Sequence, residues 1–85
     1  MNGNEMQMTT DPVLIQHVGN VKALNGRRDV TIQMHSGLKH TGDVVGARDW
    51  NTSGTNQPSR SGAYIRLKTA AGVFRLDALD IKSWS

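Results

Sequence analysis

Hydrophobic and polar residues alternate along several short stretches of this 85-residue chain, and such alternation predicts half-buried β-strands. The clearest stretch is residues 29–35, where apolar and polar side chains fall on opposite faces. His35-Ser36-Gly37 follows and suits a three-residue hairpin loop with glycine in the left-handed position. This loop predicts a register that keeps the apolar residues on one face: Met34 opposite Leu38, Ile32 opposite His40, and Val30 opposite Gly42.

The spacing of apolar residues changes before this hairpin and predicts a helix over residues 11–25. Asp11 is a favourable N-cap, and Pro12 at the first helical position loses no hydrogen bond. Apolar side chains then recur every three or four positions, at Leu14, Val18, Val21 and Leu24. We expect this stripe to cover one end of a β-barrel; a partner-binding stripe is the alternative.

The remaining pattern predicts a mainly β fold, in which the helix caps a strongly bent five-stranded antiparallel SH3-like barrel. Gly42 and Gly46 interrupt the second strand, and interior glycines are typical of the sharp bends that roll a short sheet. Residues 51–62 are almost wholly small polar or turn-forming, which predicts an inserted loop. The other predicted segments are a disordered tail at 1–10 and strands at 29–35, 38–50, 63–69, 73–77 and 79–84, within one domain spanning 11–85.

Composition narrows the class of protein. The formal net charge is +3, with residues 1–26 slightly acidic and the rest basic, which favours a polyanionic partner although many small basic domains have none. No stretch approaches the ~20 apolar residues needed to span a bilayer. The N-terminus lacks the features of a signal peptide, and the chain has no cysteine, so we expect an intracellular, cytoplasmic protein.

We find no motif that predicts catalysis, and we expect a non-enzymatic protein without cofactors. His17, His35 and His40 lack the spacing of a metal site, so we predict no metal. A domain this small has a thin stability margin, and an open barrel leaves its last two strands with unpaired backbone groups. Both features favour self-association, and head-to-tail pairing that closes produces a ring.

Two blocks resemble the motifs of a known family. VTIQMHSGLKHTGDVV (residues 30–45) is similar to the first motif of the Sm/LSm superfamily, and most closely of its Hfq-like branch, in its alternating strand, glycine turn and bent strand. VFRLDALDI (residues 73–81) is similar to the second motif, a strand, a corner and a strand. The resemblance runs from Asp11 to Ile81. It implies an Sm-like fold whose fourth and fifth strands join five to seven copies into a homo-oligomeric ring that binds single-stranded, U-rich or A-rich RNA.

The resemblance also implies site residues. Trp50 stands eight positions after Gly42, where the family carries a base-stacking aromatic residue; closure of the barrel end is the alternative role. Asp49 and Asn51 flank it, each one position away from the family's Asp and Asn. Arg75 matches a basic residue of the second motif; a salt bridge across the ring interface is its alternative.

Several departures from the family pattern concern the expected RNA pocket. Asp77 resembles an acidic residue of some members, but Leu76 replaces a small residue or histidine and Ala78 replaces a polar one. The insertion at residues 51–62 lies where the family is usually tight. These differences favour a second hypothesis, in which the protein is an oligomeric assembly or protein-interaction module that has lost RNA binding.

A second group of basic residues lies where the helix meets the first strand: Lys22, Arg27 and Arg28. Repeated around a ring, these residues would form a basic collar for the RNA backbone. A solvated surface patch is the alternative. Our leading hypothesis is an Sm-like ring that binds single-stranded RNA.

Overall fold

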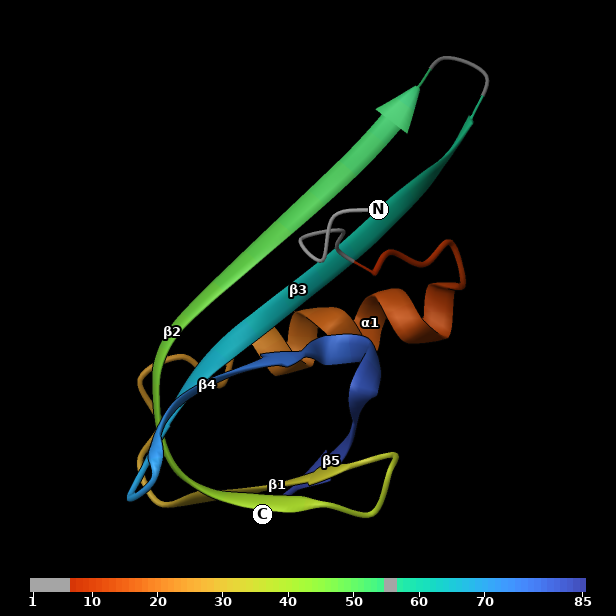
Figure 1. The fold of residues 1–85 in the computed structure, drawn as a ribbon. Helices are drawn as coiled ribbons and strands as arrows, with labels where there is room; N and C mark the ends of the chain where they lie inside the picture. Colours follow the sequence, from red (N-terminus) through yellow and green to blue (C-terminus); the bar gives the residue numbers. More distant parts are fainter. Residues whose placement is uncertain (1–6, 55–56) are drawn as a thin grey trace, which may run out of the picture.

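A computed structural model describes residues 7–54 and 57–85 of the chain. One α-helix precedes five strands and a short 3₁₀-helix, in the order α1 (Pro12–Lys22), β1 (Val30–Met34), β2 (Lys39–Gly54), β3 (Gln57–Thr69), β4 (Gly72–Asp77), η1 (Ala78–Asp80) and β5 (Ile81–Trp84) (Figure 1). In the described part of the chain, no helix is both long enough and apolar enough to cross a membrane.

The five strands form one antiparallel sheet in the order β4-β3-β2-β1-β5. The predicted mainly β class, with an N-terminal helix and five antiparallel strands, is therefore confirmed. Among the described residues β4 and β5 do not pair with each other, so hydrogen bonds do not close the sheet into a barrel. The sheet is nevertheless strongly curved, and η1 links the two edge strands across its open side (Figure 1).

Helix α1 begins where the sequence predicts and packs on the sheet. The Val13 N–H donates to the Asp11 carboxylate over 2.9 Å, which confirms the N-cap. Val18 and Val21 are buried, and Leu24 is buried just after the helix, so these three residues of the stripe cover the core, whereas Leu14 remains 40% exposed. The helix ends at Lys22 rather than residue 25, because the chain turns there and the Gly26 N–H donates to Val44 of β2.

The β1–β2 hairpin has the predicted register. Val30 lies opposite Gly42 and Ile32 opposite His40. The turn closes through a 2.8 Å hydrogen bond from the Met34 N–H to the Leu38 carbonyl. Gly37 has a φ of 94°, a conformation that L-residues rarely adopt, so this glycine permits the turn.

The predicted loop at residues 51–62 is largely wrong, because β2 and β3 continue through most of it. Asn51 pairs with Ser61 and Thr52 with Arg60 (Figure 1). A solvent-exposed two-stranded ribbon satisfies its backbone through the ladder and needs no apolar face. Small polar residues are therefore compatible with it. Residues 55–56 lie outside the described structure.

Other predicted boundaries shift by a few residues. The last strand begins at Ile81, because residues 78–80 form η1. The Leu79 N–H donates to the Asp77 carboxylate over 2.9 Å and caps that 3₁₀ turn. Residues 1–6 of the predicted disordered tail lie outside the described structure, whereas Thr9 makes a backbone pair with Ser61.

The core lies between α1 and the concave side of the sheet. Buried apolar side chains from the helix, the strands and η1 form one cluster: Val18, Val21, Leu24, Val30, Ile32, Val44, Ala63, Ile65, Leu67, Leu76, Ala78 and Ile81. His17 links α1 to η1 and β5, since its Nε2 lies 3.0 Å from the Ala78 carbonyl oxygen and 2.9 Å from the Ile81 carbonyl oxygen. Both partners are acceptors, so Nε2 carries the proton.

Candidate nucleic-acid interface

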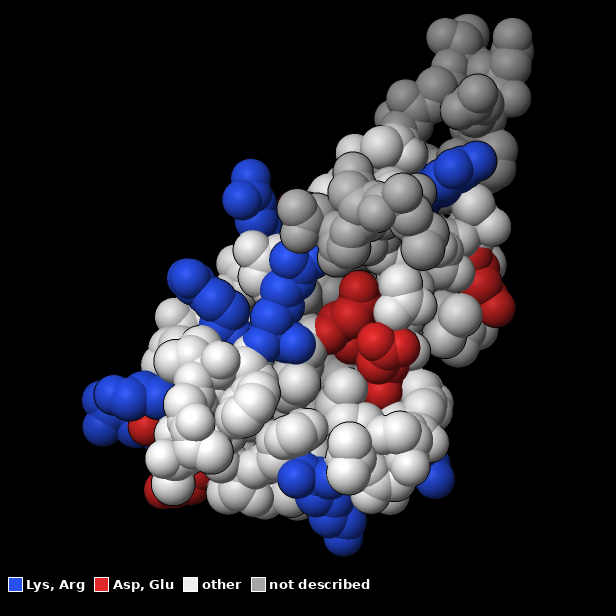
Figure 2. All heavy atoms as spheres, in the orientation of Figure 1, with Lys and Arg blue, Asp and Glu red and all other residues white. Residues whose placement is uncertain are grey.

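The outer face of β2, β3 and β4 gathers basic and aromatic residues. Successive side chains of a strand point to opposite faces, and Ile65 and Leu67 of β3 are buried in the core. Tyr64 and Arg66 therefore point outward, and the register places the same-face neighbours across the strands: Arg48 and Asp77 beside Tyr64, Arg75 and Gly46 beside Arg66, and Trp50 beside Gly62. We call the set Arg48, Trp50, Tyr64, Arg66 and Arg75 the outer-face cluster. Figure 2 shows Lys and Arg side chains gathered along this part of the sheet.

Tyr64 stands at the centre of the outer-face cluster. The Arg75 guanidinium carbon lies 4.3 Å from the centroid of the Tyr64 ring, a cation–π contact. On the other side, the Trp50 and Tyr64 ring centroids are 6.1 Å apart and tilted by 43°. Trp50 and Arg75, two of the predicted site residues, thus lie on one face on either side of a tyrosine to which the sequence interpretation gave no role.

Trp50 is packed against β3 rather than fully exposed. Gly62 leaves the space that the indole uses, since a Cβ at this glycine would lie 2.6 Å from two atoms of the Trp50 ring. The indole Nε1 is buried and has no acceptor among the described residues. A buried N–H without a partner costs about 1–3 kcal/mol. The Trp50 indole is therefore packed beside Gly62 and Tyr64, but its buried N–H has no hydrogen-bond acceptor among the described residues.

Arg66 and Arg75 are direct cross-strand partners with the same charge. Like charges in such positions are destabilising. Within the described part of the chain, the ion pair between Lys22 and Asp49 is the one found within 4 Å, so neither arginine forms a salt bridge. The charge of Arg75 does lower the pKa of Asp77 on the same face, whereas Arg66 has no such neighbour on β4. Arg66 leans across β2, because its guanidinium nitrogens occupy space that a Cβ at Gly46 would enter. An anion bound over these strands would relieve the repulsion.

The remaining predicted site residues lie elsewhere. Asp49 and Asn51 point to the helix side of β2, opposite to Trp50: Asp49 pairs with Lys22 over 2.8 Å, and Asn51 accepts a 2.6 Å hydrogen bond from the Ser61 hydroxyl. Arg27 and Arg28 are exposed in the turn before β1. The structure therefore places Lys22, Asp49 and Asn51 in a different region from Trp50 and Arg75.

Asp77, at the end of β4, has a structural role. Burial raises the pKa of its carboxyl above the ordinary value, and the hydrogen bond from the Leu79 N–H opposes that rise. The nearby backbone N–H of Gln7 also lowers this pKa, to a smaller extent. Asp77 thus caps η1.

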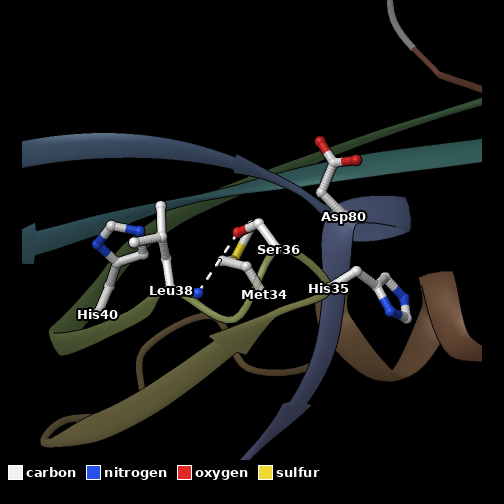
Figure 3. A pocket seen from close by; sticks show the side chains of 6 residues that line it. All are labelled: Met34, His35, Ser36, Leu38, His40 and Asp80. Atoms are coloured by element: carbon white, nitrogen blue, oxygen red, sulfur yellow. Dashed lines mark hydrogen bonds between the residues drawn. The ribbon is translucent and has the colours of Figure 1, made fainter.

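A hollow of about 270 Å³ lies between the β1–β2 turn and η1 (Figure 3). Its lining includes Met34, Leu38, His40 and Asp80. His35 and His40 point away from one another in Figure 3, so they do not share a ligand position. His40 instead stacks on Phe74 of β4, with ring centroids 5.6 Å apart. The hollow therefore lies on the open side of the sheet, where η1 connects the two edge strands.

Comparisons with known proteins do not assign the chain to a family. A scan against protein-family models and searches of curated proteins and of solved structures each found no match.

The Lys22–Asp49 ion pair should contribute little to stability. Both side chains are substantially exposed, at 51% and 35%, so water screens the attraction. We expect Lys22→Met to change the free energy of unfolding by less than about 1 kcal/mol, as measured by urea denaturation. A loss of several kcal/mol would show that the pair has a structural role that its exposure does not suggest.

Proposed function

We propose that this protein is an Sm-like, non-catalytic RNA-binding protein that assembles into a closed ring of five to seven copies and binds single-stranded RNA. The observation that carries the RNA-binding proposal is the outer-face cluster, in which three arginines and two aromatic rings share one sheet surface. Guanidinium groups bind phosphate, and aromatic rings stack on bases of any sequence. These are the two interactions that single-stranded nucleic acid needs.

The Sm-like part of the proposal is supported by the order of the elements. An N-terminal helix followed by a curved sheet in the order β4-β3-β2-β1-β5 is compatible with an Sm-like fold. The resemblance of the two sequence blocks falls on the β1–β2 hairpin and on β4 through β5.

Two features of the sheet edges support self-association. β4 and β5 are the edge strands, so each offers a row of backbone groups to another strand. Phe74 of β4 points to the core side, opposite the buried Leu67, yet 40% of its surface is exposed. Val73 and Leu38 nearby are 57% and 62% exposed. Pairing of β4 with β5 of a second copy would satisfy the backbone groups of both strands and cover apolar surface.

The second candidate is an assembly module without RNA binding. The packing of Trp50 favours it, because the indole already contacts Gly62 and Tyr64 and is not free to stack on a base. Under this hypothesis the arginines are a solvated surface, and the edge strands still associate.

Assembly and RNA binding can be measured separately. Light scattering should give a mass of five to seven copies, and fluorescence anisotropy should detect binding to oligo-U or oligo-A that weakens as salt rises. A stable monomer would exclude the ring. A ring that binds neither oligonucleotide at low salt would favour the assembly module.

The edge of β4 should be needed for assembly. We expect Phe74→Glu to dissociate the ring, because it places a charge where a second copy would cover apolar surface. Val45→Glu is the matched control, since Val45 is a 48% exposed valine on β2 and lies on neither edge strand. Sedimentation velocity should show a monomer for the first variant and the parental mass for the second. Unchanged mass for Phe74→Glu would contradict pairing through β4.

A further inference from the structure

The N-terminal segment, Gln7 to Thr9, lies against β3 where β4 stops. β4 pairs with β3 only as far as Tyr64, which lies opposite Asp77. Beyond that point Thr9 takes over: its N–H donates to the Ser61 carbonyl over 2.9 Å, and the Ser61 N–H donates to the Thr9 carbonyl over 3.0 Å. The segment therefore supplies a short strand that continues the edge begun by β4.

At Gln7 the segment crosses from the edge of the sheet onto the outer face. The Gln7 carbonyl occupies the space that a Cβ of Gly62 would fill, and a Cβ projects out of the plane of a sheet. The edge of the Trp50 indole lies 2.6 Å from the same Cβ position, so Gln7 and the indole are neighbours over Gly62. The backbone N–H of Gln7 also lowers the pKa of the Asp77 carboxyl, which lies at the end of β4.

We propose that Gln7 to Thr9 form a strap that closes the Trp50 part of the outer-face cluster, and that a base reaches Trp50 only after the strap leaves Gly62. The contacts that hold the strap include the two backbone hydrogen bonds between Thr9 and Ser61 and the close approach of the Gln7 carbonyl to Gly62. Terminal segments held by a few backbone hydrogen bonds open at low cost. Opening would also free the buried indole Nε1, which lacks an acceptor among the described residues, to donate to a ligand. This inference rests on the proposed RNA binding, but the strap itself can be tested without RNA.

Thr9→Pro tests the strap. Proline removes the N–H that donates to Ser61 and leaves the core untouched. Thr9→Val is the matched control, because both variants lose the hydroxyl that accepts from the Asp11 N–H, and only proline loses the backbone donor. Trp84→Phe in all proteins makes Trp50 the single tryptophan, which can be excited selectively over Tyr64. We expect Thr9→Pro to raise the acrylamide quenching constant of Trp50 by about twofold and to speed exchange of the Ser61 amide by about tenfold, with Thr9→Val unchanged.

RNA then separates the strap from the proposed function. If both hold, Thr9→Pro should bind oligo-U or oligo-A about fivefold more tightly than Thr9→Val, since binding no longer requires strap opening. Unchanged quenching would overturn the strap. Increased quenching with unchanged RNA affinity would show that the strap covers Trp50 without controlling binding, which also overturns the inference.

If quenching of Trp50 increases in Thr9→Pro and no variant binds RNA, the result supports the strap as a cover for Trp50 and contradicts the proposed RNA binding. A chain that starts at Met8 provides a second variant that leaves Trp84 in place. It lacks the Gln7 carbonyl that lies over Gly62 but keeps Thr9, and it should show the same faster Ser61 exchange.

Discussion

Gly42→Ala should destabilise the protein by about 3 kcal/mol, the largest loss of stability that we expect from a single methyl group in this chain. The Lys68 backbone carbonyl oxygen occupies the site that the new Cβ would fill, its carbonyl carbon lies 2.8 Å from that site, and the Thr69 Cα lies 3.2 Å from it. These are backbone atoms of the neighbouring strand and cannot rotate away as a side chain can. Accommodating the methyl group would force β2 and β3 apart where the sheet bends.

Gly19→Ala is the control for this prediction. Gly19 lies on the exposed side of α1, and no atom lies within 4 Å of its Cβ position, so the new methyl group meets no obstacle. Replacing an exposed helical glycine by alanine should stabilise the protein by about 0.5–1 kcal/mol. Thermal and urea denaturation of both variants would test the pair. A tolerated Gly42→Ala would show that β2 can bend without this close approach.

The β1–β2 hairpin was predictable because one local register satisfies several independent constraints. Val30, Ile32 and Met34 must share a face, and a three-residue turn with glycine at position 37 places them opposite Gly42, His40 and Leu38 and keeps Lys39 off that face. The β2–β3 ribbon was not predictable in the same way. Its outer part has no core to face, so its residues carry no apolar alternation, and a composition typical of loops hides a strand pair held by backbone hydrogen bonds.

The candidate site was predictable only in part, for a related reason. The sequence resemblance singled out Trp50 and Arg75, and both lie on one face of the sheet. Tyr64 joins them, yet its role depends on the β2–β3 and β3–β4 registers, which a single sequence does not specify. Asp49 illustrates the converse. It is adjacent to Trp50 in sequence, but the alternation of side chains along β2 turns it toward α1 and Lys22.

The packing of Trp50 and the strap over Gly62 both reduce the exposure of the indole on the outer face. An aromatic residue on a strand without a covering layer exposes apolar surface, and Gly62, Tyr64 and Gln7 reduce that exposure. The arginines need no such cover because their charged ends remain in water. We therefore expect the arginines of the outer-face cluster to contact the phosphates of RNA first. Trp50 should contact a base only when the strap opens.

Replacing Arg66 and Arg75 together by glutamine should reduce affinity for single-stranded RNA by about thirtyfold or more near 0.1 M salt, the largest functional effect that we expect. Each arginine that contacts a phosphate of a single strand contributes about 0.7 to the slope of log affinity against log salt concentration, so the slope should fall by about 1.4. The fold should survive. The lost Arg75–Tyr64 contact is worth roughly 0.5–1 kcal/mol, and relief of repulsion between the two arginines offsets part of it.

Arg27→Gln with Arg28→Gln provides the matched control. This control also removes two positive charges, but from the turn before β1, where the sequence suggests a basic collar. If RNA binds over β2, β3 and β4, this pair should change affinity only a few-fold through the general loss of charge. Anisotropy titrations at several salt concentrations distinguish the two surfaces. A large loss for the Arg27 and Arg28 pair with none for Arg66 and Arg75 would move the RNA to the collar, and equal small losses would leave only non-specific attraction to a basic domain.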